Sequence, residues 1–240
     1  MGSMTVTGRL ELTAFDAADI DSLASFYSEL TGWAVASKES SWITLRAEDG
    51  QEIAFQAAPD HVAPRWPTQE LPQQVHLDLQ VEDHVAAAER AVGLGATRLA
   101  EGANWITLAD PAGHPFDLCQ KDGVGPGMRL FAVTLDAPDA SSLARFYAAL
   151  LGMELTYEGP EGALIAGGGK SVLFQQVSSY TPPRWPDPAH PQQGHLDILV
   201  DDLDAGQARA VELGASPLEG GGTSYRVFAD PAGHPFCLCV

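Results

Sequence analysis

Two short segments of the 240-residue sequence place a histidine and an aspartate two positions apart. The first segment is VHLDLQV, with His76 and Asp78, and the second is GHLDILV, with His195 and Asp197. Because side chains alternate along a strand, each pair falls on one face and the leucines between fall on the other. An imidazole beside a carboxylate can act as a general base or grip a polar ligand. All four side chains are therefore candidate catalytic residues; the alternative is that each aspartate only accepts hydrogen bonds from loop backbone.

These segments recur because the sequence repeats itself. The octapeptide ADPAGHPF occurs at 109–116 and again at 229–236, and within it Asp-Pro-Ala-Gly predicts a turn. The similarity continues in register over nearly the whole sequence, which indicates a tandem duplication. We predict two domains, 9–120 and 129–240, joined by a linker rich in glycine and proline, 121–128.

Each half contains two units with the same predicted order of elements: a strand, a helix and three further strands. The helix of the first unit follows the capping residue Asp19 and ends before a glycine. Its apolar residues recur every three or four positions: Leu23, Phe26, Tyr27 and Leu30. This spacing predicts a helix with one buried face. We predict an α+β fold in which the two units of each half form a half-barrel mixed sheet.

Charge and composition exclude several classes of partner. The sequence has 13 lysine and arginine residues against 32 aspartate and glutamate residues, a formal net charge of −19. Such acidity excludes nucleic acid and an anionic membrane surface as partners. No apolar run approaches the roughly 20 residues of a membrane span, and the N-terminus lacks a secretion signal. Three cysteines are too few for a disulfide framework, so we expect a cytoplasmic protein.

Three motifs follow one another in both halves: an opening DAADIDSLASFYSELTGW, the strand HLDLQV and the closing DPAGHPF. The second half has the closing motif unchanged and keeps ten of the 18 residues of the opening motif. The order of these motifs resembles that of the vicinal oxygen chelate superfamily. This superfamily includes glyoxalase I, extradiol dioxygenases and bleomycin-binding resistance proteins, and the sequence is most similar to its glyoxalase-like branch, duplicated in tandem. The resemblance implies paired βαβββ units around a cleft. It also implies that the two domains pack as a pseudo-dimer within a monomeric chain.

Metal-dependent members of the superfamily hold a divalent ion with side chains from the first and last strands of their units. The resemblance places Leu12 and Ala132 at the first-strand ligand position, where neither can bind a metal. It places His76 and Asp117 at two other ligand positions of the first half. We therefore expect at most one divalent ion per chain, at His76 and Asp117. The alternative is a cleft that binds no metal.

The second half offers a poorer set of ligands. The resemblance pairs His195 with Cys237, but Cys237 and Cys239 also fit two small apolar residues of a buried strand. The fourth-strand ligand position falls on Gln56 in the first half and on Gln175 in the second. We expect each glutamine to line the cleft of its own half.

Two tryptophans complete the set of candidate ligand-binding residues. Trp66 and Trp185 each lie in a PRWP motif, within a proline-rich loop that leads into an HLD strand. Prolines restrict the loop, and the indole offers a large face to a ligand. We expect these rings at the rim of the cleft. The alternative is that each ring packs over the edge of the sheet.

The lost first-strand ligands favour binding over catalysis. We expect a protein of the glyoxalase/bleomycin-resistance type that sequesters a small organic molecule, with antibiotics among the candidates. The strong acidity favours a cationic ligand. The alternative is a glyoxalase-like lyase, isomerase or oxygenase with a degenerate metal site, or one that uses metal-free His/Asp chemistry. Metal analysis of the purified protein separates these alternatives.

Overall fold

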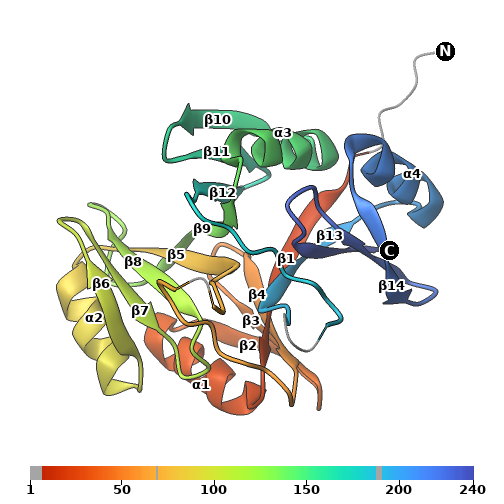
Figure 1. The fold of residues 1–240 in the computed structure, drawn as a ribbon. Coiled ribbons are helices and arrows are strands. Elements are labelled where there is room, and N and C mark those ends of the chain that lie inside the picture. The colour runs from red at the N-terminus through yellow and green to blue at the C-terminus, as the bar shows by residue number, and fades with distance from the viewer. Residues whose placement is uncertain (1–6, 69, 188–190) are drawn as a thin grey trace.

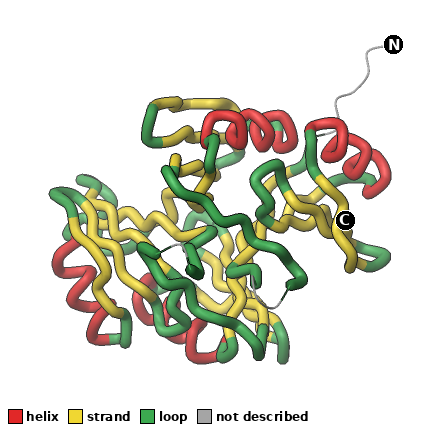
Figure 2. Tube along the Cα trace, viewed as in Figure 1, coloured by secondary structure: helices red, strands yellow, loops and turns green. Residues whose placement is uncertain are grey.

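The computed structural model describes residues 7–68, 70–187 and 191–240. In this part of the chain the strands form two eight-stranded mixed sheets, and the helices lie on the outside of the molecule (Figures 1 and 2). The predicted α+β fold with half-barrel sheets is confirmed, since neither sheet closes on itself.

The elements are distributed over the sheets as follows. Sheet A contains, from edge to edge, β14 (Ser216–Gly221), β15 (Tyr225–Ala229), β16 (Pro235–Cys239), β13 (Gly194–Leu199), β1 (Arg9–Ala17), β4 (Glu52–Ala57), β3 (Trp42–Arg46) and β2 (Ala34–Lys38). Sheet B contains β10 (Glu154–Gly159), β11 (Gly162–Gly167), β12 (Lys170–Gln176), β9 (Arg129–Ala137), β5 (Val75–Val81), β8 (Pro115–Gln120), β7 (Trp105–Ala109) and β6 (Thr97–Glu101). The helices are α1 (Ile20–Thr31), α2 (His84–Gly93), α3 (Ala140–Leu151) and α4 (Leu203–Leu213).

Each sheet combines one unit from each half, whereas the sequence predicted that the two units of one half share a sheet. In sheet A, β1 pairs antiparallel with β13, and in sheet B, β5 pairs antiparallel with β9 (Figure 1). The physical reason is the duplication itself. Strands β5 and β13 are repeats of one another, so both offer β1 an equivalent edge. Sequence similarity identifies the units but not which copy is the partner.

Helix packing holds each half together across the two sheets. Helix α1 begins after Asp19, whose side chain caps it, and ends at Gly32, whose φ of 81° suits glycine. The ring of Tyr27 stacks on Phe55 of sheet A and meets Phe116 of sheet B edge-on. Helix α1 therefore contacts both sheets, and α3 makes the equivalent ring contacts in the second half.

The repeated octapeptide forms the turn between the last two strands of each half. Asp110 accepts hydrogen bonds from the backbone N–H groups of Ala112 and His114. The Tyr27 hydroxyl donates to the Asp110 carboxylate at 3.0 Å, and His114 Nδ1 lies 3.2 Å from the same oxygen. The same contacts recur around Asp230. Asp110 thus ties the turn to helix α1, and the repeated histidine is a buried structural residue that contacts this aspartate.

A reciprocal pair of glutamines joins the two halves. The backbone N–H of Gln74 donates to the side-chain oxygen of Gln193 at 2.9 Å, and the N–H of Gln193 donates to that of Gln74 at 3.0 Å. Each side-chain amide also donates to a backbone carbonyl of the opposite half. This exchange indicates an approximate two-fold relation between the halves. The linker, 121–128, lies outside both sheets.

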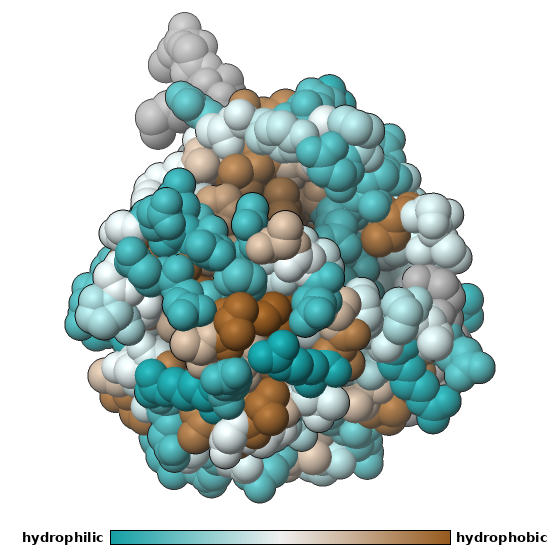
Figure 3. All heavy atoms as spheres, turned by 90° about the vertical axis from the view of Figure 1, so that its left-hand side faces the viewer, coloured by the Kyte–Doolittle hydropathy of each residue, from teal (hydrophilic) through white to brown (hydrophobic). Residues whose placement is uncertain are grey.

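In the view of Figure 3, hydrophilic residues cover most of the molecule, and apolar residues form small separate patches. None of the helices in the described residues is long and apolar enough to cross a membrane.

Candidate functional site

Both histidine–aspartate pairs lie on the sheet face opposite the helices. In β13 the side chains of Leu196 and Ile198 are buried in the core beneath the helices. The alternating residues His195 and Asp197 therefore point to the other face of sheet A. Strand β5 repeats this arrangement in sheet B.

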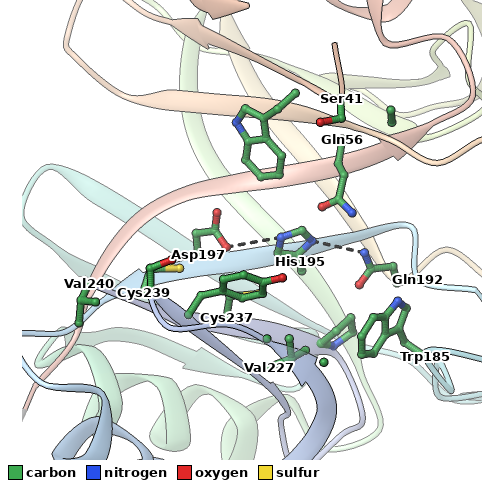
Figure 4. Close-up of a pocket in the computed structure, with 17 residues that line it drawn as sticks. Ser41, Gln56, Trp185, Gln192, His195, Asp197, Val227, Cys237, Cys239 and Val240 are labelled. Carbon is green, nitrogen blue, oxygen red and sulfur yellow. Dashed lines mark hydrogen bonds and ion pairs between the residues drawn. The ribbon is translucent and has the colours of Figure 1, made fainter. Parts of the chain in front are cut away.

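A cavity of about 610 Å³ opens on this face of sheet A (Figure 4). We call it the aromatic cleft, because Trp42 of β3, Trp185 of the loop before β13 and Tyr225 of β15 line it. Its polar lining includes four side chains: Gln56, Gln192, His195 and Asp197. Among the described residues that line it there is no lysine or arginine.

Both ring nitrogens of His195 have a polar neighbour (Figure 4). Its Nε2 lies 3.4 Å from the Asp197 carboxylate, and the Gln192 amide nitrogen lies 3.5 Å from its Nδ1. The same amide donates to the buried Asp16 carboxylate at 2.9 Å. Since an amide nitrogen donates, Nδ1 of His195 is the acceptor in this contact.

The two thiols in the aromatic cleft are poor nucleophiles. Cys237 and Cys239 lie on β16, two residues apart, and both line the cleft. Burial, together with the nearby Asp197 carboxylate, raises the pKa of the Cys239 thiol to about 12 and raises the pKa of the Cys237 thiol as well. Because the thiolate is the reactive form, neither side chain is activated at neutral pH.

The equivalent face of sheet B carries a different group, which we call the carboxylate cluster: His76, Asp78 and Asp117. His76 Nε2 lies 3.8 Å from Asp78 Oδ1 and 3.9 Å from Asp117 Oδ2. Burial raises the pKa of Asp78, although the neighbouring imidazole opposes this. In sheet A, Cys237 takes the place of Asp117.

The structure brings several predicted residues together but places two of them, Gln56 and Gln175, in the other sheet from the one expected. His195, Asp197 and Trp185 all line the aromatic cleft. The sequence assigned Gln56 to the cleft of the first half, but it lies on β4 in sheet A and lines the same cleft as His195. Gln175 lies on β12 in sheet B, with the strand that carries His76. Both assignments were wrong because the units pair across the halves.

Sequence reasoning missed three residues that line the aromatic cleft: Trp42, Tyr225 and Gln192. Trp42 is the first residue of β3 and pairs with Gln56 of β4. The equivalent residue of the second half is Gly162, which pairs with Gln175. A comparison of the two repeats for such differences could have singled it out. Trp66 is half-buried in the corresponding loop of the first half.

Two buried carboxylates at equivalent positions, Asp16 and Asp136, give the fold a testable pH dependence. Burial raises the pKa of Asp136, although the Gln73 amide donates to it at 3.1 Å. Such a group stabilises the fold at a pH below its unfolded pKa of about 3.9, and this contribution is lost as the pH rises through the folded pKa. We expect Asp136→Asn to be more stable than the wild type at pH 7 and to lose that advantage by pH 4. Urea unfolding at several pH values measures this; a difference independent of pH would contradict it.

Comparison with known proteins also identifies a duplicated domain. The family model described as a glyoxalase-like domain matches residues 13–119 and again residues 132–239. No curated protein matches the sequence.

Solved structures share the fold over the full chain. Glyoxalase I from Zea mays is 18% identical, with a TM-score of 0.62, over 97% of this chain and 92% of that chain. A putative dioxygenase from Bacillus subtilis is 11% identical, with a TM-score of 0.63, over 98% of this chain and 86% of that chain. The cppA protein from Streptococcus pneumoniae is 14% identical, with a TM-score of 0.54, over 99% of both chains. At these identities the likeness shows the fold alone.

Proposed function

The chain belongs to the glyoxalase-like domain family, and from that premise we propose that it binds a small organic molecule in the aromatic cleft without converting it. One observation carries this proposal: a cavity of about 610 Å³ is lined by three aromatic rings and a cluster of polar side chains. Small-molecule sites are concave and mostly apolar, with a few placed polar groups and volumes of roughly 300–1,000 Å³.

The lining favours a flat, ring-containing ligand. Trp42 comes from the first half of the chain, whereas Trp185 and Tyr225 come from the second, so the rings border the cavity from both sides of the β1·β13 junction. Aromatic rings stack on planar ligands at little cost in side-chain entropy. The volume accommodates a drug-sized molecule.

Charge favours a ligand that is cationic or rich in hydrogen-bond donors. Asp197 is an acceptor in the cleft, and no lysine or arginine among the described lining residues would neutralise an anion. The chain as a whole carries a formal net charge of −19. Acidic surroundings and aromatic faces both attract organic cations. We therefore expect planar aromatic amines, including antibiotics of that chemistry, to bind in preference to carboxylates or phosphates.

The chemistry of the cleft supports binding over turnover. His195 Nε2 lies 3.4 Å from the Asp197 carboxylate and Nδ1 lies 3.5 Å from the Gln192 amide nitrogen, so both ring nitrogens face groups of the protein itself. Raised pKa values keep Cys237 and Cys239 protonated. Among the described lining residues, the site thus holds donors and acceptors in fixed directions, and neither thiol is activated as a nucleophile.

A thermal-shift screen of planar amines, organic cations and matched anions tests this proposal, followed by calorimetry on the best ligand. We expect Trp185→Ala and Trp42→Ala each to weaken its binding by at least about tenfold, because central aromatic contacts carry most of the energy of such sites. Mass spectrometry of the ligand after incubation should return it unchanged.

Trp66→Ala is the matched control, since it removes the equivalent ring of the first half. It should leave the affinity unchanged. A loss of affinity confined to Trp66→Ala would place the ligand elsewhere, and a product in the mass spectrum would identify an enzyme.

A further inference from the structure

The side-chain amide of Gln56 points into the aromatic cleft from β4 (Figure 4). No hydrogen bond joins this amide to another of the described residues. By contrast, the amide nitrogen of Gln192, in the same cleft, donates to the buried Asp16 carboxylate at 2.9 Å. Gln56 therefore keeps both its N–H donor and its carbonyl acceptor for a ligand.

Trp42 stands directly opposite Gln56 on the neighbouring strand β3. Directly opposite residues point to the same face of the sheet, with Cβ atoms about 4.5–5.5 Å apart. The indole N–H donates to Thr44 Oγ1 at 3.1 Å. The ring packs against a small apolar cluster: Leu12, Ala14 and Ala54. These contacts hold the indole in place, so a planar ligand stacked on it can bring one edge to the Gln56 amide.

Two further hydrogen-bond acceptors line the same cleft. The side-chain oxygen of Gln192 receives no hydrogen bond from the described residues, because the contacts of this side chain with Asp16 and His195 all run through its amide nitrogen. Asp197 adds a carboxylate, and no lysine or arginine is found among the described lining residues. A ligand that pairs with Gln56 therefore gains from carrying an additional N–H group.

The free amide of Gln56 restricts the chemistry of the ligand edge. A carboxamide offers one donor and one acceptor in a plane, and it pairs with an edge that offers an acceptor beside a donor. Glutamine meets adenine in this way, through a ring nitrogen and the neighbouring amino group. A lactam edge also has one donor and one acceptor, but it has no further N–H for Gln192 and Asp197. An amino group has a second N–H that can donate to them.

We propose that Gln56 selects, for the aromatic cleft, planar nitrogen heterocycles that carry an amino group beside a ring nitrogen. The Gln56 carbonyl oxygen accepts one amino N–H, and the amide nitrogen donates to the ring nitrogen, while the heterocycle stacks on Trp42. This inference rests on the proposed function and narrows its class of ligand. An aromatic amine without the adjacent ring nitrogen would leave the Gln56 N–H without a partner, which costs affinity.

Sheet B keeps the glutamine but lacks the ring beside it. Gln175 of β12 is the equivalent of Gln56, and its cross-strand neighbour is Gly162. An added Cβ at Gly162 would lie 2.3 Å from the Phe174 carbonyl oxygen, so a side chain there would displace the backbone. A ligand edge at Gln175 thus finds no aromatic ring on the residue directly opposite. We therefore expect this selection in sheet A and not in sheet B.

Two probes of the same shape test the proposal: 2-aminoquinoline has its amino group beside the ring nitrogen, and 3-aminoquinoline does not. Ligand-observed NMR titrations give both dissociation constants at a pH where the probes are neutral. The wild type should bind 2-aminoquinoline at least about tenfold more tightly, because only this probe pairs with both groups of the amide. Gln56→Met, which keeps the length of the side chain, should reduce this ratio to within about twofold. Gln175→Met is the matched control in sheet B and should leave the ratio unchanged.

Gln56→Glu adds a result that a purely structural role of Gln56 would not produce. A carboxylate accepts hydrogen bonds from both atoms of an edge, so this variant should favour 2-aminoquinoline whose ring nitrogen is protonated. Its affinity relative to the wild type should therefore rise as the pH falls through the pKa of the probe. Taking the ratio to the wild type removes the contribution of His195 and Asp197, which face the same cleft.

Equal affinity of the wild type for the two probes, or an equal loss for both in Gln56→Met, overturns the proposal. Trp42→Ala separates this failure from failure of the proposed function. If the probes bind equally and Trp42→Ala still weakens both at least about tenfold, the cleft binds planar amines without selection by Gln56. If neither probe binds up to its solubility limit, both the selection and the proposed function are wrong. Circular dichroism of each variant separates a lost contact from a lost fold.

Discussion

Replacing Gly194 with alanine should lower the free energy of unfolding by about 1–3 kcal/mol, although it only adds a methyl group. Gly194 is the first residue of β13 and stands opposite Phe15 of β1. An added Cβ would lie 2.6 Å from the Ala14 carbonyl oxygen and 3.1 Å from Val75 Cγ1. The carbonyl belongs to the backbone of the strand that joins the halves, so it cannot move without weakening that junction.

Gly127→Ala is the control for this prediction. Gly127 lies in the linker, and an added Cβ there would have no atom within 4 Å. Its effect should stay within about 0.5 kcal/mol. Urea unfolding curves of the two variants measure the contrast, and equal stability would show that the β1·β13 junction relaxes freely.

The meeting of Val75 with Gly194 illustrates what the sequence could and could not predict. The repeat, the capping residues and the alternation of HLDL predict the four units and the exposed face of each central strand, because these are local patterns. Pairing of the units is not local. Val75 and Gly194 are equivalent residues of the two repeats, and only the folded structure shows that they meet.

Prediction of the site residues was limited in the same way, because it too depends on how the units pair. The sequence predicted His195, Asp197 and Trp185 as neighbours, because they lie in one unit of the repeat. It misplaced Gln56, because that residue reaches the cleft from the other half. It did not single out Asp78 as a cross-strand neighbour of Ala132, because register across β5 and β9 has no signature in either strand alone.

Divergence between the repeats explains why one fold offers two different sites. Where sheet A has Trp42, sheet B has Gly162, and an added Cβ at Gly162 would lie 2.3 Å from a backbone oxygen. Where sheet B has Thr107 and Asp117, sheet A has Val227 and Cys237. Each difference removes from one sheet a side chain that lies at the equivalent position of the other sheet. We infer that sheet A has specialised in aromatic contacts and sheet B in carboxylate contacts.

Separately produced halves should reassemble into a one-to-one complex. Residues 1–124 keep the contacts of α1 within the first half, but β1 and β5 lose their partners β13 and β9. Exposed edges of this kind pair with any complementary strand. Residues 125–240 supply both missing strands, together with Lys170, which donates to the backbone carbonyls of Leu10 and Glu11. Native mass spectrometry of the mixed fragments should therefore show the heterodimer.

The heterodimer should also outcompete a homodimer of the first fragment by at least about fivefold. Two copies of residues 1–124 could pair β1 with β5, because β5 is the repeat of β13, but this would bring two Val75 side chains into the place where Val75 meets Gly194. Such overpacking costs about 1–3 kcal/mol. Gly194→Val in the second fragment should remove most of the preference, because it creates the same conflict in the heterodimer. Equal amounts of homodimer and heterodimer with the wild-type fragments would show that the junction does not distinguish the repeats.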